Sequence, residues 1–94
     1  MLLKPGVDIS KLNREIRRAL KKIEAAYPDF VVTSTYEGSH QPSSLHYCHD
    51  AIDIRDDNWV GEPIDPELLK QRLGIDFDVV KSANCIHIEY DPKG

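Results

Sequence analysis

The sequence predicts a small α+β domain in which helices lie on one side of a mostly antiparallel sheet. Two observations predict this class. An early segment repeats its apolar residues at helical spacing, and segments near the C-terminus alternate apolar and polar residues as strands do. A length of 94 residues suits one modest hydrophobic core, so we expect residues 1–94 to form a single domain.

The first expected element is an amphipathic helix that ends at Pro28. Its apolar positions recur at steps of three and four residues and are Ile9, Leu12, Ile16, Leu20, Ile23 and Tyr27. Asp8 or Ser10 can cap its start. Half of the 12 basic residues fall in the same segment: Lys11, Arg14, Arg17, Arg18, Lys21 and Lys22. We interpret this basic face as the solvated side of the helix. Attraction to an anionic polymer is the weaker alternative.

A strand is expected next, over residues 30–35, where apolar and β-branched residues gather. Residues 37–44 form a polar loop that we expect to border the functional site. A second loop follows at residues 56–62, and its one large apolar residue is Trp59. For Trp59 we favour packing over the core above the alternative of lining a substrate groove.

The C-terminal third predicts a short helix and a hairpin. Asp65 caps a helix over residues 66–72 that begins with proline, and Gly74 ends it. Residues 77–81 and 85–90 then form a hairpin around a three-residue turn.

Composition excludes several function classes. The net charge of −4 does not suggest a polyanionic partner, and the basic segment lacks the interleaved aromatic residues of nucleic-acid binders. No apolar run approaches the length of a membrane span. Residues 1–6 are too short and too soon interrupted to serve as the apolar part of a signal peptide, so we expect cytoplasmic synthesis. We expect a monomer with neither a nucleic-acid nor a membrane partner.

The main candidate for a functional site joins His46, Asp53 and His87. Asp53 lies between two isoleucines in a strand pattern, so its side chain faces away from them. The same alternation in residues 85–90 places His87 on one face with Cys85 and Glu89. Asp53 and His87 can therefore meet from neighbouring strands. The seven-residue step from His46 to Asp53 requires a turn or bulge if both are to reach one ion.

Two histidines and a carboxylate are ligands typical of zinc. Three protein ligands leave the fourth tetrahedral position for water, which distinguishes catalytic from structural zinc. We therefore predict a Zn²⁺ site at His46, Asp53 and His87 that supports metal-assisted hydrolysis.

These residues resemble a known family. The sequence Ser44-x-His46, an aspartate seven residues after that histidine, and His87 between two isoleucines are similar to the zinc D-Ala-D-Ala carboxypeptidases and related peptidoglycan peptidases. Their fold is shared with the hedgehog signalling domain, and the similarity extends over residues 30–91. The resemblance implies zinc held by His46, Asp53 and His87, and D-amino-acid-containing peptides of peptidoglycan as substrates. The compact length is compatible with a phage or bacterial origin.

The resemblance also points to catalytic residues. The family usually has an acidic base three residues before the last histidine, where this chain has Asn84, and often a histidine at the next position, where this chain has Cys85. Glu89 is the nearest alternative base by strand parity, although the family's glutamate there is a supporting residue. His40 could partly compensate for an arginine that is Glu37 here.

Two residues are candidates for contact with a substrate. In the family the Ser44 hydroxyl helps to hold the substrate or the site loop, although a serine there also suits a turn. Tyr36 can line the cleft or pack against the domain.

Several alternatives stay open. Without a base, the chain would be a non-catalytic, zinc-stabilised binding module. The Cys85 thiolate shares the face of His87 and could fill the open position on zinc. Cys48 and Cys85 could form a disulfide, but an intracellular protein favours reduced cysteines. A nucleophilic pair of Cys48 and His49 is disfavoured because adjacent strand side chains point apart.

Overall fold

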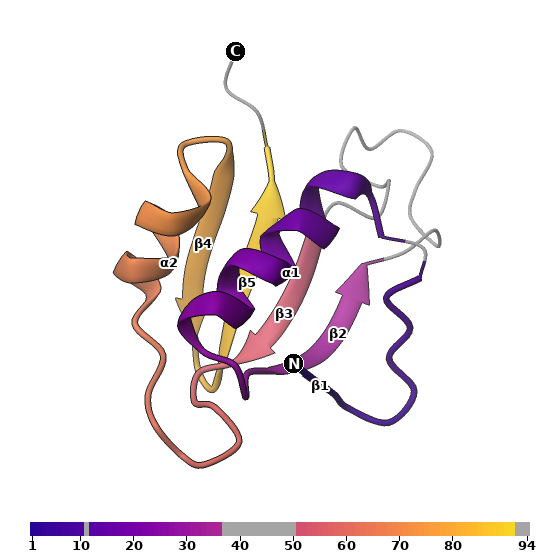
Figure 1. Cartoon of the computed structure of the whole chain (residues 1–94), viewed down its shortest axis with the longest axis vertical. Coiled ribbons are helices and arrows are strands. Elements are labelled where there is room, and N and C mark those ends of the chain that lie inside the picture. The colour runs from indigo at the N-terminus through magenta and orange to yellow at the C-terminus, as the bar shows by residue number, and fades with distance from the viewer. Residues whose placement is uncertain (11, 37–50, 92–94) are drawn as a thin grey trace.

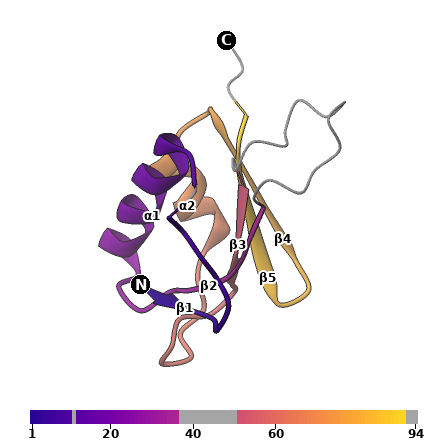
Figure 2. The same cartoon turned by 90° about the vertical axis from the view of Figure 1, so that its right-hand side faces the viewer.

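Both helices of the described chain lie on one face of a single sheet (Figure 1 and Figure 2). This computed structural model describes residues 1–10, 12–36 and 51–91. The elements in these ranges are β1 (Leu2–Leu3), α1 (Arg14–Ala26), β2 (Val31–Tyr36), β3 (Ala51–Arg55), α2 (Pro66–Leu73), β4 (Phe77–Ser82) and β5 (Cys85–Tyr90). The predicted α+β class, with a mostly antiparallel sheet and helices on one side, is confirmed.

The sheet has the strand order β1-β2-β3-β5-β4. β1 pairs with β2 in parallel, and the other neighbours pair antiparallel. The sequence-distant strands β3 and β5 therefore lie side by side at the centre of the sheet. This pairing is what allows residues more than thirty positions apart to share one site.

A β-bulge interrupts the pairing of β2 with β3. Val32 pairs with Ile54 and Ser34 pairs with Asp53, so Thr33 is an extra residue on β2. A bulge changes which face the following side chains occupy. Ser34 is consequently placed opposite Asp53 rather than one position out of register with it.

The core lies between the helices and the sheet. Its fully buried members are Ile16, Ile23, Phe30, Val32, Ile52, Ile54, Leu69, Ile86 and Ile88. Apart from Phe30, which directly precedes β2, these residues come from α1, α2 and the strands β2, β3 and β5. In β3 and β5 the buried isoleucines alternate with polar residues on the opposite face. Burial at roughly 25 cal/mol per Å² makes this layer the main source of stability.

The first helix begins later than the sequence suggested. Asn13 occupies its N-cap position and Arg14 is its first residue, whereas Asp8 and Ser10 lie before it. The Asp8 carboxylate accepts hydrogen bonds from the backbone N–H and the hydroxyl of Ser10, at 2.8 and 2.6 Å. The prediction that either residue caps the helix is wrong, because this local turn uses the same groups outside it.

The second helix matches its prediction closely. The Asp65 side chain accepts a hydrogen bond from the N–H of Glu67 at 2.9 Å, and Pro66 occupies the first turn. Gly74 follows the helix with φ of 92°, a conformation that favours glycine. Within the described ranges, neither helix combines the length and the apolar character that a membrane span requires.

The hairpin of β4 and β5 has a tighter turn than expected. Ser82 still pairs with Cys85, which leaves only Ala83 and Asn84 between the strands. Ala83 adopts φ of 45°, and this left-handed conformation closes a two-residue turn.

The loop after β3 turns Trp59 outward. Trp59 is 67% exposed, so the expectation that it packs over the core is wrong. The buried side chain of Asn58 holds the loop instead, because its Oδ1 accepts a hydrogen bond from the N–H of Glu62 at 2.8 Å. The N–H of Trp59 donates to the carbonyl oxygen of Asp29 at 2.8 Å. These bonds fix the loop while leaving the indole at the surface.

Candidate metal centre

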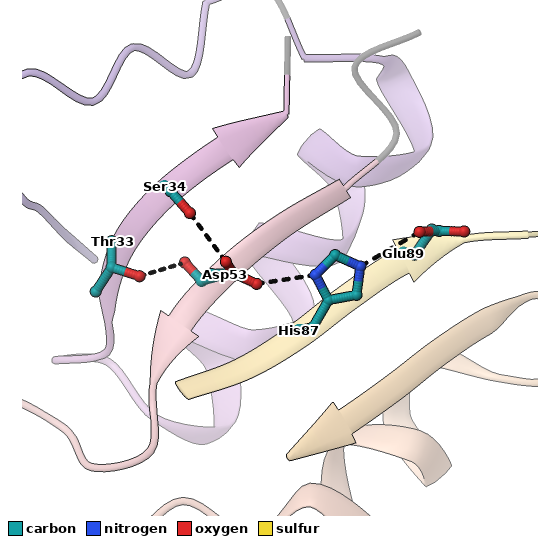
Figure 3. A network of polar contacts seen from close by, with 5 residues as sticks. All are labelled: Thr33, Ser34, Asp53, His87 and Glu89. Carbon is teal, nitrogen blue, oxygen red and sulfur yellow. Dashed lines mark hydrogen bonds and ion pairs between the residues drawn. The ribbon is translucent and has the colours of Figure 1, made fainter. Parts of the chain in front are cut away.

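The candidate site lies on the face of the sheet opposite the helices. β3 and β5 pair Asp53 directly with His87, and the isoleucines that flank each residue are fully buried on the other face. Figure 3 shows the two side chains pointing toward each other. The predicted orientation of Asp53 and His87, and their meeting across neighbouring strands, are confirmed.

The two side chains are close enough to share an ion. His87 Nδ1 and Asp53 Oδ1 lie 2.8 Å apart, and their side chains are 31% and 20% exposed. Two ligand atoms on a tetrahedral zinc are separated by about 3.3 Å. A widening of a few tenths of an ångström would therefore bring these two of the three predicted ligands to the separation that one zinc ion requires.

Asp53 and His87 each make a second contact, through the carboxylate oxygen and the ring nitrogen that do not face each other. The Ser34 hydroxyl donates a hydrogen bond to Asp53 Oδ2 at 3.0 Å, and Glu89 Oε1 lies 3.3 Å from His87 Nε2 (Figure 3). A histidine that binds a metal commonly donates its other N–H to a carboxylate, which fixes the tautomer and the ring orientation. Here that arrangement would leave His87 Nδ1 and Asp53 Oδ1 as the ligand atoms.

Sequence reasoning missed Ser34. Uninterrupted alternation from buried Val32 would place Ser34 on the core side of β2, but the bulge at Thr33 brings it to the face of Asp53. The Thr33 hydroxyl also donates to the backbone oxygen of Asp53, at 3.3 Å. The only hint in the sequence is the run of hydroxyl residues 33–35, which suits a strand but does not reveal a bulge.

The electrostatic surroundings favour a charged imidazole in the metal-free protein. Burial lowers the pKa of His87, but hydrogen bonds to Asp53 and Glu89 and the negative charges of both carboxylates raise it by more. The net effect is a pKa above the ordinary value of 6.5. A protonated imidazole donates to both carboxylates at once, and zinc would have to displace one proton to bind.

Glu89 sits beside this pair and belongs to a second acidic group. Asp78, Glu89 and Asp91 are the one set of three possible metal-binding side chains in the described ranges whose ligand atoms lie within 4.8 Å of one another. All three are half-buried, and such acidic groups are common without a metal. The role of Glu89 as an alternative base stays a prediction. Its contact with His87 makes it, in this geometry, a residue that positions the imidazole.

Asn84 and Cys85 lie at the turn end of β5. Asn84 is exposed, and its carbonyl oxygen accepts a hydrogen bond from the N–H of Asp56 at 3.1 Å. Cys85 is a half-buried free thiol that pairs with Arg55 on the face of His87. Among the described residues, Cys85 does not join Asp53 and His87 in a group of ligand atoms within 4.8 Å. The predicted roles of both residues stay predictions.

Of the remaining predicted site residues, the structure describes only Tyr36. His40, Ser44, His46 and Cys48 lie outside the described residues. Tyr36 ends β2, where its backbone pairs with Ala51 two residues before Asp53. The role of His46 as a zinc ligand therefore stays an expectation from the sequence, whereas Asp53 and His87 are seen side by side.

Comparison of the chain with protein-family models, curated proteins and solved structures finds no match.

Proposed function

We propose that this chain is a zinc-dependent metallopeptidase-like domain that hydrolyses peptidoglycan peptides containing D-amino acids, with zinc held by His46, Asp53 and His87. The observation that carries the proposal is the facing pair of Asp53 Oδ1 and His87 Nδ1 at 2.8 Å, with an outer contact on each residue's other atom. The substrate class, and the family's hedgehog-type fold, rest on the resemblance of residues 30–91 alone.

The residues divide into ligands and supports. Asp53 and His87 project from the two central strands, whose opposite faces form the core, so their positions are rigid. Ser34 holds the Asp53 carboxylate, and Glu89 holds the imidazole of His87. When bound, zinc supplies a Lewis acid that polarises a carbonyl and lowers the pKa of water.

The proposed reaction lacks the acidic residue that usually serves the family as its base. Asn84 stands at the position of the family's base, and a carboxamide cannot take a proton at neutral pH. The Glu89 carboxylate lies against His87, so acting as a base would compete with positioning the imidazole. General acid–base catalysis is worth roughly 10²–10⁴-fold, so we expect slow hydrolysis.

One observation favours a second candidate function. Because Glu89 contacts His87 and Asn84 replaces the base, the zinc site could serve stability rather than chemistry. The chain would then be a zinc-stabilised module that binds the same peptides without cleaving them. A bound metal adds its binding free energy to folding, which matters for a chain of 94 residues.

Zinc stoichiometry tests the site. We expect the wild-type protein to bind one zinc ion, and His46→Ala, Asp53→Ala and His87→Ala each to lose it. Asp78→Asn is the matched control, because it removes a neighbouring carboxylate on the same face without touching the proposed ligands. Full stoichiometry in all three ligand variants, or loss of zinc in Asp78→Asn alone, would contradict the site.

Peptide cleavage tests the reaction. Zinc-loaded protein and its Asn84→Asp variant are incubated with peptidoglycan fragments, and the products are identified by mass spectrometry. Cleavage by the wild type supports the peptidase. Cleavage by the variant alone identifies a peptidase scaffold that lacks its base, and silence in both favours the binding module.

A further inference from the structure

The exposed side of α1 carries a stripe of positive charge. Ile16, Ala19, Leu20 and Ile23 are buried under the helix, so its opposite side faces outward on the helix side of the domain (Figure 2). Steps of three and four residues align the side chains of a helix along one face. Five exposed cations follow this spacing on the outward side, and we call them the basic stripe: Arg14, Arg17, Arg18, Lys21 and Lys22.

Four members of the basic stripe surround one cavity. It has a volume of about 280 Å³ and is lined by Arg14, Arg17, Arg18 and Lys21. The step from Arg14 to Lys21 corresponds to a rise of about 10 Å along a helix. Four positive charges are therefore concentrated over a short length of α1, around a hollow that has no carboxylate among its described lining residues.

No member of the basic stripe forms an ion pair in the described part of the chain. Of the two carboxylates of α1, Glu24 pairs with the amino group of Met1. Glu15 lies three residues before Arg18 but forms no ion pair with it. The ion pairs that are present use other cations, which are the N-terminal amino group, Arg55, Lys70, Lys81 and His87. The charges of the stripe are therefore not matched by neighbouring carboxylates.

Helix stability does not explain this pattern. Cations are unfavourable at the positive N-terminal end of the helix dipole, and cations three or four residues apart repel each other. In α1 the first turn holds Arg14 and Arg17 beside Glu15, and the last turn holds no basic residue. α2 has the favourable order, with Glu67 in its first turn, Lys70 in its last turn and an ion pair of 3.2 Å between them. The basic stripe therefore lowers the stability of α1, which indicates a role other than folding.

We propose that the basic stripe binds a linear, base-free polymer of phosphodiester groups. A row of unmatched cations complements a row of anions, and arginine can bind phosphate oxygens through two parallel N–H groups. The fully described helix α1 has no aromatic side chain on which a nucleic-acid base could stack. It also exposes no large apolar side chain that could enter a lipid bilayer. Recognition by charge alone therefore favours a base-free polymer over a nucleic acid or a membrane.

The charges on the other side of the domain orient it on such a polymer. The chain has a net charge of −4 although α1 is basic. Asp53, Asp78 and Glu89 share the open face of the sheet, on β3, β4 and β5. A polyanion attracts the helix side and repels this acidic side. The polymer therefore leaves the candidate metal centre free, and the proposal does not depend on the proposed function.

Calorimetric titration of the unaltered protein with poly(glycerol phosphate) of defined length tests the proposal. We expect saturable binding at about 50 mM salt, with a dissociation constant that rises at least about tenfold by about 200 mM, because each engaged cation releases counterions from the polymer. A single-stranded oligonucleotide with the same number of phosphates should bind no more tightly. Absence of binding at the lower salt concentration, or binding that does not depend on salt, would overturn the proposal. A preference for the oligonucleotide of about fivefold or more would overturn it in favour of a nucleic acid.

Variants locate the contact. Arg18→Gln should weaken polymer binding by about threefold or more and make the salt dependence less steep, because one charge contact is lost. Arg72→Gln is the matched control, because it removes the same charge from an exposed position on α2. It should leave the affinity within about twofold. An equal loss of affinity in the two variants would show that net charge rather than the basic stripe attracts the polymer, and the proposal would be wrong.

Stability separates binding from a structural role. Removing one of several like charges relieves repulsion within α1, so Arg18→Gln and Lys21→Gln should lose affinity while their urea midpoints stay unchanged or rise. A fall in affinity and midpoint together in both variants would show that these residues support the fold instead. Self-association of the wild type without polymer, abolished in the same variants, would overturn the proposal and assign the stripe to the acidic face of a second copy.

The basic stripe and the metal centre fail separately. His87→Ala should bind the polymer as the wild type does, because His87 lies on the opposite face of the sheet. Loss of zinc in this variant with unchanged polymer binding would support both sites. Retention of zinc in it would contradict the metal centre alone, and failure of the wild type to bind the polymer would remove the stripe alone.

Discussion

The Ser34 hydroxyl donates a hydrogen bond to Asp53 Oδ2 at 3.0 Å, across the point where the bulge at Thr33 shifts the register of β2. The bond occupies one oxygen of the carboxylate and leaves Oδ1 directed at His87 Nδ1. A carboxylate fixed in this way loses little conformational entropy when it takes up a metal. The bulge is therefore part of the candidate metal centre, although the Thr33 hydroxyl donates to the backbone oxygen of Asp53 and not to its carboxylate.

Replacing the Ser34 hydroxyl should weaken zinc binding without removing a ligand. We expect Ser34→Ala to raise the zinc dissociation constant by about 10–100-fold, the usual effect of losing an outer contact of a metal ligand. Competition with a chromophoric chelator measures the change. Ser82→Ala, at an exposed strand end, is the control and should leave affinity within about twofold. An unchanged dissociation constant in Ser34→Ala would show that Asp53 does not need this support.

Glu89 should act as a positioning residue rather than as the base. If its carboxylate holds His87 Nε2, Glu89→Gln should weaken zinc binding by about tenfold or more. A base would behave differently, because its loss would leave zinc affinity intact and remove the acidic limb of the pH–rate profile. Zinc titration and, where turnover is measurable, the pH profile of kcat/KM therefore separate the two roles.

The sequence was most informative where one periodicity ran without interruption. Alternation around Asp53 and in residues 85–90 correctly placed Asp53 and His87 on one face, because buried isoleucines leave each strand only one register. Asp65 and Pro66 likewise predicted the start of α2, since both act through local backbone chemistry.

Three features were not predicted from the sequence: the turn at Asp8, the bulge at Thr33 and the outward position of Trp59. Asp8 can cap a helix or close a turn with Ser10, and only the surrounding structure decides between them. The bulge at Thr33 has no sequence signature, so Ser34 escaped attention. Trp59 is large and apolar, which favours burial on average, but hydrogen bonds of its loop direct it outward.

The hairpin turn offers a stability test. Ala83 holds φ of 45°, a conformation that costs an L-residue with a Cβ atom roughly 1 kcal/mol. We expect Ala83→Gly to raise the free energy of unfolding by up to about 1 kcal/mol, because glycine adopts this conformation without strain. Urea denaturation of the metal-free protein measures it. Ser82→Gly, within β4, should instead lower stability, and a loss of stability in Ala83→Gly would show that the turn is not strained.

The metal-free protein should lose stability as the pH rises above 6.5. The folded-state pKa of His87 lies above its unfolded value of 6.5, so the protonated imidazole stabilises the fold. That contribution is fully present below pH 6.5 and is lost as the pH rises through the higher folded pKa. Urea midpoints from pH 5.5 to 8.5 in chelator should fall over this window in the wild type. His87→Gln should lack this component of the fall, and an identical fall in both proteins would contradict the assignment.

The affinity for zinc should rise with pH, whereas the stability of the metal-free protein falls. Zinc binds the neutral imidazole, so the proton on His87 competes with the metal, and affinity should increase by up to tenfold per pH unit until the pH exceeds the folded pKa. Glu89→Gln removes one of the two carboxylates that raise this pKa. Its affinity should therefore reach its plateau at a lower pH than that of the wild type, even though the plateau itself is weaker. Zinc competition titrations across pH 5.5 to 8.5 give both quantities for each protein. A plateau at the same pH in the two proteins would show that Glu89 does not tune His87, and a flat profile in both would show that His87 is not a ligand.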